Sequence, residues 1–196
     1  LGNDAALGTG ALIVGGAATL DTTGLATLAN NIALNAGLTV LGTQALTLNG
    51  VLSGAGSLTK NGSATLTLNG ANTYTGGTTI NGGSTLQIGN GGSTGSVLGD
   101  ITNNGSLVYN LGNTATVGAV VSGSGGLIKN GASNLTLNGI NTYTGITSLS
   151  AGTLRVGNNN ALGTGVLNTS NGTSLEILER AHQLPGKAPG RKQSDH

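Results

Sequence analysis

Paired carboxyl groups are the first chemistry to test in this sequence. Hydrolysis of a glycosidic bond needs two of them about 5–9.5 Å apart. Residues 1–178 hold four acids, and three of these, Asp21, Asp100 and Glu176, are widely separated along the chain. Asp4 and Asp21 are the only two that are close in sequence. The spacing indicates no catalytic dyad, so we expect no catalytic residue.

Metal and cofactor sites have even less support. The two histidines, His182 and His196, lie near the C-terminal end, and there is no Cys and no His-x-x-x-His pair. Gly89–Gly95 is rich in glycine, but neither a Lys nor a helical pattern follows it to hold a phosphate. It also lacks the repeated Asp of calcium-binding β-rolls. We therefore expect no metal and no cofactor.

The charge pattern argues against nucleic acid as a partner. The chain has 7 basic and 6 acidic residues, and only Lys60, Lys129 and Arg155 are basic within residues 1–178. Binding to phosphates requires a basic stripe or patch, and the sequence of residues 1–178 indicates none.

Two of these cations belong to an internal repeat. Val51–Gly76 recurs as Val120–Gly145. The two copies align without gaps, and 18 of 26 positions are identical. Lys60 matches Lys129, and Tyr74 matches Tyr143 at the same offset. A long match in constant register indicates a structural unit that is copied and stacked.

The matched lysines and tyrosines could bind a ligand, but a structural role is the simpler interpretation. If Lys60 and Lys129 lie three coils apart on one edge, they could form a basic site. We instead predict solvated corner residues that discourage strand mispairing. Tyr74 and Tyr143 could be platforms for sugars. We instead predict that each ring covers a neighbouring coil, with its hydroxyl reaching water or backbone.

The elements that position these residues are short strands. Alternating apolar and polar residues give half-buried strands, as at Leu66 and Leu68 and again at Leu135 and Leu137. Asn-Gly pairs between the strands suggest turns with positive φ, and so leave open antiparallel hairpins. The strand starts at Leu46, Leu66 and Leu86 recur at an even spacing, however, that is too long for a hairpin. This spacing suits one strand per coil in a parallel stack.

Composition supports a narrow core. The chain has 38 Gly, no Phe, Trp, Met or Cys, and three Tyr, so thin layers of small aliphatic residues must fill the interior. We predict a parallel β-helix of about eight coils in residues 1–178. The repeat unit, at 32–100 and 101–168, is expected to span about three coils. Stacked turns would place Asn69 and Asn138 in amide ladders.

The C-terminal end of the sequence departs from the repeat pattern, whereas the N-terminal end continues it. Residues 179–196 hold both Pro and both His without any strand pattern. We interpret them as a disordered tail, vector-derived sequence or out-of-frame read-through, or else as a basic tail that contacts a surface. Leu1–Gly10 resembles Val156–Gly165, so the chain begins within the pattern, and we expect it to be a fragment.

Leu58–Asn90 carries a specific phrase: a Lys, TLTL, NTYTG and a strand that ends in Gly-Asn, which recurs at 127–158. This phrase resembles the autotransporter-associated β-strand repeat of Gram-negative surface proteins. The resemblance implies a right-handed β-helical passenger at the cell surface. It also implies export through a C-terminal β-barrel, and both that barrel and a signal peptide would belong to the parent protein.

We therefore expect a non-catalytic stalk or adhesive segment, with host or cell-surface carbohydrate or protein, or a second copy, as its partner. Two alternatives remain, a carbohydrate-active β-helix enzyme and a self-assembling matrix fibre. Ice binding needs a regular threonine array, and Thr47, Thr67 and Thr136 are interrupted by Ala, Ser and Asn. We do not expect such an array.

Overall fold

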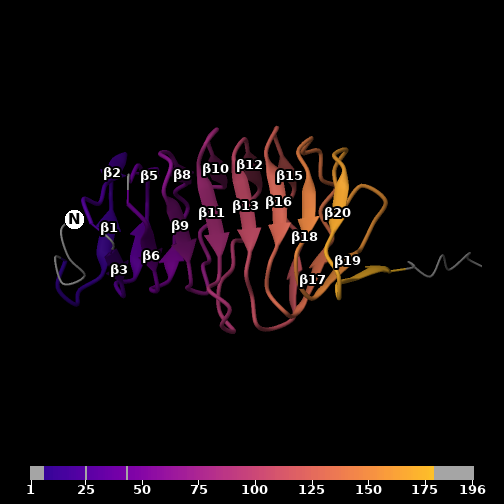
Figure 1. Ribbon diagram of the computed structural model, residues 1–196. Helices are drawn as coiled ribbons and strands as arrows, with labels where there is room; N and C mark the ends of the chain where they lie inside the picture. The colour runs from indigo at the N-terminus through magenta and orange to yellow at the C-terminus, as the bar shows by residue number, and fades with distance from the viewer. Residues whose placement is uncertain (1–6, 25, 43, 179–196) are drawn as a thin grey trace, which may run out of the picture.

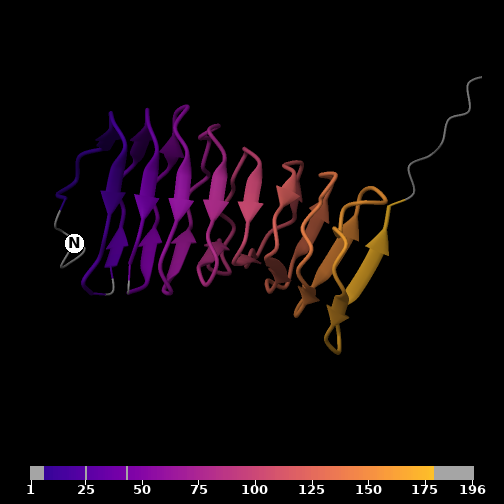
Figure 2. The same ribbon diagram turned by 90° about the horizontal axis from the view of Figure 1, so that it is seen from above.

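The chain forms a rod of stacked coils in the computed structural model (Figure 1). The structure describes residues 7–24, 26–42 and 44–178. Regular structure in this described part consists of β-strands only, and it contains no helix able to cross a membrane. The tail predicted at 179–196 lies outside the described residues. Figure 2 shows the strand direction turning gradually from the N-terminal coils to the C-terminal ones.

The strands form four sheets that run along the rod. Sheet A contains β1 (Leu12–Val14), β4 (Ile32–Leu34) and β7 (Leu52–Ser53). Sheet B contains β2 (Ala18–Leu20), β5 (Leu38–Val40), β8 (Leu58–Lys60), β10 (Thr78–Ile80), β12 (Ile101–Asn103) and β15 (Val121–Ser122). Sheet C contains β3 (Ala26–Leu28), β6 (Leu46–Leu48), β9 (Thr65–Leu68), β11 (Thr85–Ile88), β13 (Ser106–Tyr109), β16 (Gly126–Lys129), β18 (Thr147–Leu149) and β20 (Leu167–Thr169). Sheet D contains β14 (Ala115–Val117), β17 (Asn134–Leu137), β19 (Thr153–Val156) and β21 (Ser174–Ile177).

Strand register confirms the parallel solenoid. Leu46 pairs with Leu66 and Leu66 with Leu86, so the evenly spaced leucines lie on successive coils. Every strand pairing given for the described residues is parallel, from β1 with β4 to β19 with β21, and sheet C alone has eight strands. The hairpin alternative is therefore wrong.

The core is a stack of inward-pointing aliphatic side chains. Leu66, Leu68, Leu135 and Leu137 are all at most 1% exposed. They alternate with outward-facing threonines, as the period of a strand requires. A narrow rod of this kind holds its coils by backbone ladders and by contacts between neighbouring layers.

The two repeat copies do not lie on the same faces of the rod. Three register steps in sheet C lead from Leu66 to Leu127, and the chain then continues to Leu135 in sheet D. Likewise β8 of the first copy lies in sheet B, whereas its counterpart β16 lies in sheet C. The prediction of about three coils per repeat unit therefore falls short by one face. The unit spans three coils plus one face, so each copy is rotated by one face.

The Asn-Gly corners are also not what the sequence suggested. Positive φ occurs at Gly62, but not at Gly50, Gly70 or Gly105. At these three positions a Cβ atom would lie only 2.0–2.3 Å from a backbone oxygen of the coil before. Glycine is needed there because stacked corners approach closely, not because the turn is left-handed.

Candidate functional site

The NTYTG segments hold residues that bridge coils. In the first copy, Asn72 is 1% exposed. Its Oδ1 accepts the backbone N–H of Leu52 at 2.8 Å, and its Nδ2 donates to the Ser96 carbonyl at 2.9 Å. Asn141 repeats this arrangement with Val121 N–H and the Ala161 carbonyl. Each asparagine thus joins the coil before it to the coil after it.

The tyrosines of the same segments fill the core. Tyr74 and Tyr143 are both 0% exposed. The Tyr74 hydroxyl lies 2.6 Å from Thr78 Oγ1, and the Tyr143 hydroxyl 2.5 Å from Thr147 Oγ1. The rings are therefore buried, which excludes them as platforms for sugars. Their hydroxyl partners are threonine side chains, not the water or backbone that we expected.

The glycine that ends each segment allows close stacking. A Cβ on Gly145 would lie 2.3 Å from the Gly125 carbonyl oxygen, and one on Gly76 would lie 2.5 Å from the oxygens of Ala55 and Gly56. Since no real Cβ atom tolerates these distances to backbone, only glycine fits. Along each NTYTG segment, the asparagine therefore bridges coils, the tyrosine fills the core and the glycine allows close contact between coils.

The two lysines are buried, and the prediction of solvated corner residues is wrong. Each is 1% exposed. Lys60 Nζ donates to the carbonyls of Leu41 at 3.0 Å and Gly62 at 2.9 Å, and also to that of Asn61. A corner of the solenoid leaves carbonyl groups without ladder partners, and the ammonium group satisfies them.

Lys129 makes the equivalent corner in the second copy. Its Nζ donates to the carbonyl of Gly131 and, at 3.1 Å, to that of Ala151 in the next coil. Burial lowers the pKa of both lysines. Because Lys60 lies in sheet B and Lys129 in sheet C, they do not share an edge. The hypothesis of a paired basic site therefore fails.

We expect Lys60→Met to lower the free energy of unfolding by about 2 kcal/mol, because it keeps the volume but leaves buried carbonyls unpaired. Urea unfolding followed by circular dichroism measures the change. Arg155→Met removes a partly exposed cation, whose ion pair with Glu176 lies at the surface, and serves as the control, with a change within about 0.5 kcal/mol. Equal effects of the two substitutions would show that the Lys60 ammonium group does not stabilise the corner carbonyls.

Asn69 and Asn138 lie at stacked corners, as the sequence suggested, but they bond differently. Asn69 Nδ2 donates to Asn49 Oδ1 at 3.1 Å, which is one step of an amide ladder. At Asn138 the backbone carbonyl, not the side chain, accepts a hydrogen bond from Asn158 Nδ2 at 2.7 Å. A side-chain amide ladder therefore forms at Asn69 but not at Asn138.

Removing a bridging asparagine should be costly. We expect Asn72→Ala to lower the free energy of unfolding by about 2 kcal/mol, because it leaves Leu52 N–H and the Ser96 carbonyl buried and unpaired. The matched control is Asn113→Ala, at an exposed position, which we expect to be neutral. Chemical denaturation of both variants tests the bridge. A neutral Asn72→Ala would show that the bridge adds nothing to stability.

The acidic side chains that the structure describes bind backbone N–H groups or form a surface ion pair. Asp21 Oδ1 accepts Gly42 N–H at 3.0 Å, and Asp100 Oδ1 accepts Val120 N–H at 2.9 Å. Glu176 in β21 forms an ion pair with Arg155 at 2.6 Å. Asp4 lies outside the described residues. Within the described ranges no group of three or more His, Cys, Asp or Glu side chains could hold a metal ion.

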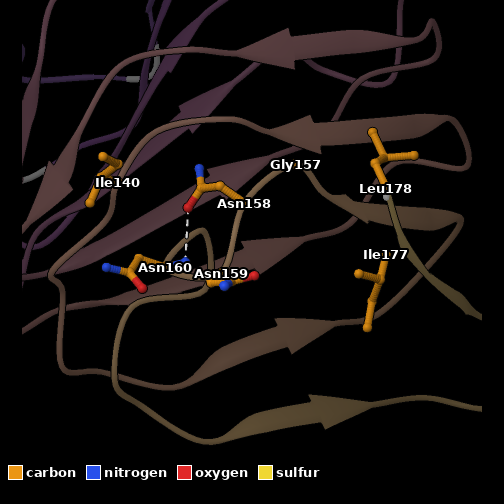
Figure 3. Close-up of a pocket in the computed structure, with 7 residues that line it drawn as sticks. All are labelled: Ile140, Gly157, Asn158, Asn159, Asn160, Ile177 and Leu178. Atoms are coloured by element: carbon orange, nitrogen blue, oxygen red, sulfur yellow. Dashed lines mark hydrogen bonds between the residues drawn. The ribbon is translucent and has the colours of Figure 1, made fainter. Parts of the chain in front are cut away.

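A groove of about 530 Å³ lies beside the last described coils (Figure 3). Ile177 and Leu178 lie on one side and Ile140 on the other, with Asn158, Asn159 and Asn160 between them. Asn158 Oδ1 accepts the Asn160 N–H at 2.8 Å. No ionisable side chain among the described residues lines this groove, so its residues offer no acid, base or nucleophile.

Comparison with known proteins matches the same two repeat segments. The family model of the passenger-associated-transport-repeat matches residues 58–88 and 127–156. A stretch of 68 residues is 42% identical to a protein of Brucella suis biovar 1 (strain 1330) named "Adhesin BmaC autotransporter". That stretch is 35% of this chain and 2% of the relative. No solved structure matches the chain.

Proposed function

We propose, from two passenger-associated transport repeats within one β-solenoid, that this chain is a segment of an autotransporter passenger that acts as a non-catalytic spacer with an adhesive surface. The resemblance predicted from the sequence is confirmed by the family match. Because the chain spans 2% of the adhesin that it resembles, the activity and partners of the whole protein belong to this proposal.

The observation that carries the proposal is how the repeat uses its distinctive residues. The lysines cap corner carbonyls, the asparagines bridge coils, and the tyrosines fill the core. None of these side chains remains available for catalysis at the surface. A repeat whose buried lysine, asparagine and tyrosine hold coils together supports a mechanical role.

The mechanism follows from the geometry of the rod. Backbone ladders connect each coil to the next, and a continuous aliphatic core runs through them. Bending such a rod would break many of these contacts at once, so it can hold attached regions at a distance from the cell. Display on the outer surface of a Gram-negative bacterium, with a barrel translocator in the parent protein, is part of the same proposal.

The test is surface display. The chain, placed between a signal peptide and a translocator barrel in a Gram-negative host, is expected to be cleaved by protease added to intact cells. The same cells should show no cleavage of a panel of pectin and other polysaccharides. Polysaccharide cleavage that disappears on Asp21→Asn or Glu176→Gln would instead establish an enzyme, and failure to reach the surface would reject the passenger role.

A further inference from the structure

Sheet B carries an uninterrupted row of outward-facing hydroxyl groups. The second residues of its strands pair in register from β2 to β15. In order along the rod they are Thr19, Thr39, Thr59, Thr79, Thr102 and Ser122. Figure 1 labels these strands one after another along the rod. At about 4.8 Å per coil, the row is about 24 Å long. The sequence had suggested that the threonines were interrupted, but in this sheet they are not.

The row is held rigidly. Thr59 lies between Leu58 and Lys60, whose side chains point inward and are at most 1% exposed. Threonine is also stiff at χ1 because it is β-branched. These hydroxyl groups therefore lose little conformational freedom when they bind a ligand.

The borders of the row leave it open. Small residues, Gly37, Ser57 and Gly77, precede three of the strands. On the other side the Asn61 and Asn81 side chains are hydrogen-bonded to each other. The result is a polar strip along the rod. Small residues border it on one side, and asparagine amides border it on the other.

Charge and ring chemistry restrict what can bind this strip. No residue of the row is ionisable, and Lys60, the nearest cation, points into the core. Asp100, at the border of β12, would repel a polyanion. The three tyrosines are buried, so no aromatic ring is available for stacking. An uncharged polymer rich in hydroxyl groups fits these conditions.

We propose that sheet B binds an extended, neutral β-linked glycan that lies along the rod axis. The sugar units of such a chain repeat at an interval close to the spacing between coils. Successive units can therefore meet successive threonine hydroxyls, each of which both donates and accepts a hydrogen bond. This inference rests on the proposed function, because the strip must be exposed at the cell surface.

The experiment is affinity electrophoresis of the whole chain in gels that contain hydroxyethyl cellulose. We expect the glycan to retard the protein. The Thr59→Val and Thr79→Val double variant should bind about tenfold more weakly, since valine keeps the shape but removes the hydroxyl. The matched control changes Thr47 and Thr67, which pair in register on sheet C, to Val, and should bind like the wild type. Circular dichroism checks that both variants are folded.

Each outcome decides the inference. No retardation of the wild-type chain, or equal binding by the two double variants, overturns it. Stronger retardation by polygalacturonate overturns the requirement for a neutral chain. Ice shaping by the wild type that is lost only in the sheet B variant shows that the row orders water, not sugar. Surface display does not depend on these threonines, so the proposed function can fail or succeed separately.

Discussion

Gly145→Ala is expected to lower the free energy of unfolding by about 3 kcal/mol or more, enough to unfold several coils. A Cβ at this position would lie 2.3 Å from the Gly125 carbonyl oxygen and 2.4 Å from its carbon. Both neighbours are backbone, so neither can rotate away. The coils would have to separate, and separation weakens the ladder hydrogen bonds on all faces of the rod.

Gly118→Ala is the matched control. It lies in the same part of the rod, and a Cβ there would meet nothing within 4 Å. We expect it to be neutral or stabilising by about 0.4–1 kcal/mol, because alanine has less freedom in the unfolded chain. Urea midpoints from circular dichroism compare the two. If both variants unfold at the wild-type midpoint, the stacked corners are looser than described.

The Gly145 result would also explain the position of glycine in the repeat. Glycines recur at one corner on successive coils, and a Cβ on each would meet backbone of the preceding coil: Gly105, Gly125, Gly145 and Gly165. The ladder therefore depends on the close approach of coils. A sequence shows that glycine recurs, but it does not show whether the reason is turn conformation or contact with a neighbouring coil.

Local periodicity was sufficient to predict the strands and their parallel stacking. Leu66 and Leu68 alternate with threonines, and the even spacing of Leu46, Leu66 and Leu86 gives their register. These features depend on neighbouring residues and on constant intervals. The sequence therefore predicts them directly.

The faces of the rod could not be predicted in the same way. The coil length varies, because the step from Thr78 to Ile101 in sheet B is longer than the step from Leu58 to Thr78. Three coils take 61 residues from Leu66 to Leu127, whereas the repeat offset is 69 residues, so the remaining eight residues move each copy to the next face. The threonine row of sheet B was missed because of the varying coil length, since the row becomes continuous only when Thr79 is paired with Thr102 across the longer step.

Burial of Lys60 was missed for a different reason. Charged residues are almost never fully buried unless they are paired, and the repeat around Lys60 contains no acid to pair with it. Its partners are backbone carbonyls, which no sequence pattern displays. The position itself held a signal, however, because Lys60 occupies an inward-facing site of a strand that begins at Leu58.

Alkaline unfolding driven by the tyrosines is the second large effect that we expect. Burial raises the pKa of Tyr74 to about 12, although its hydrogen bond to Thr78 offsets part of this increase. Burial also raises the pKa of Tyr109, with further increases from Tyr74 and Tyr143, and it raises that of Tyr143. In the unfolded chain a tyrosine titrates near pH 10.

The direction of the effect follows from proton binding. Below pH 10 both states keep the phenol protons, and the stability is fully present. As the pH rises from 10 to 12, the unfolded chain releases protons that the folded rod retains, so unfolding becomes more favourable. Tyr74 alone removes about 3 kcal/mol over this interval. The lysines act in the opposite sense, because their lowered pKa values favour the folded rod as the pH rises toward 10.5.

The measurement is a pH titration that follows tyrosinate absorbance and far-ultraviolet circular dichroism together. The sequence contains no Trp, so no indole absorbance overlaps the tyrosinate signal. We expect tyrosinate to appear only as the β signal is lost, at a pH well above that of tyrosine amide in solution. Tyrosinate that appears near pH 10 with the β signal intact would contradict the buried positions.

Tyr109→Phe provides the internal control. The Tyr109 hydroxyl is buried and has no hydrogen-bond partner among the described residues, so its removal should leave the stability at neutral pH unchanged or slightly raised. Tyr74→Phe, in contrast, leaves the Thr78 hydroxyl buried without its partner and should cost about 1 kcal/mol. Both variants lose one titrating phenol and should unfold less steeply above pH 10. The difference between them at neutral pH therefore separates the hydrogen bond from the titration, which the wild-type curve alone combines.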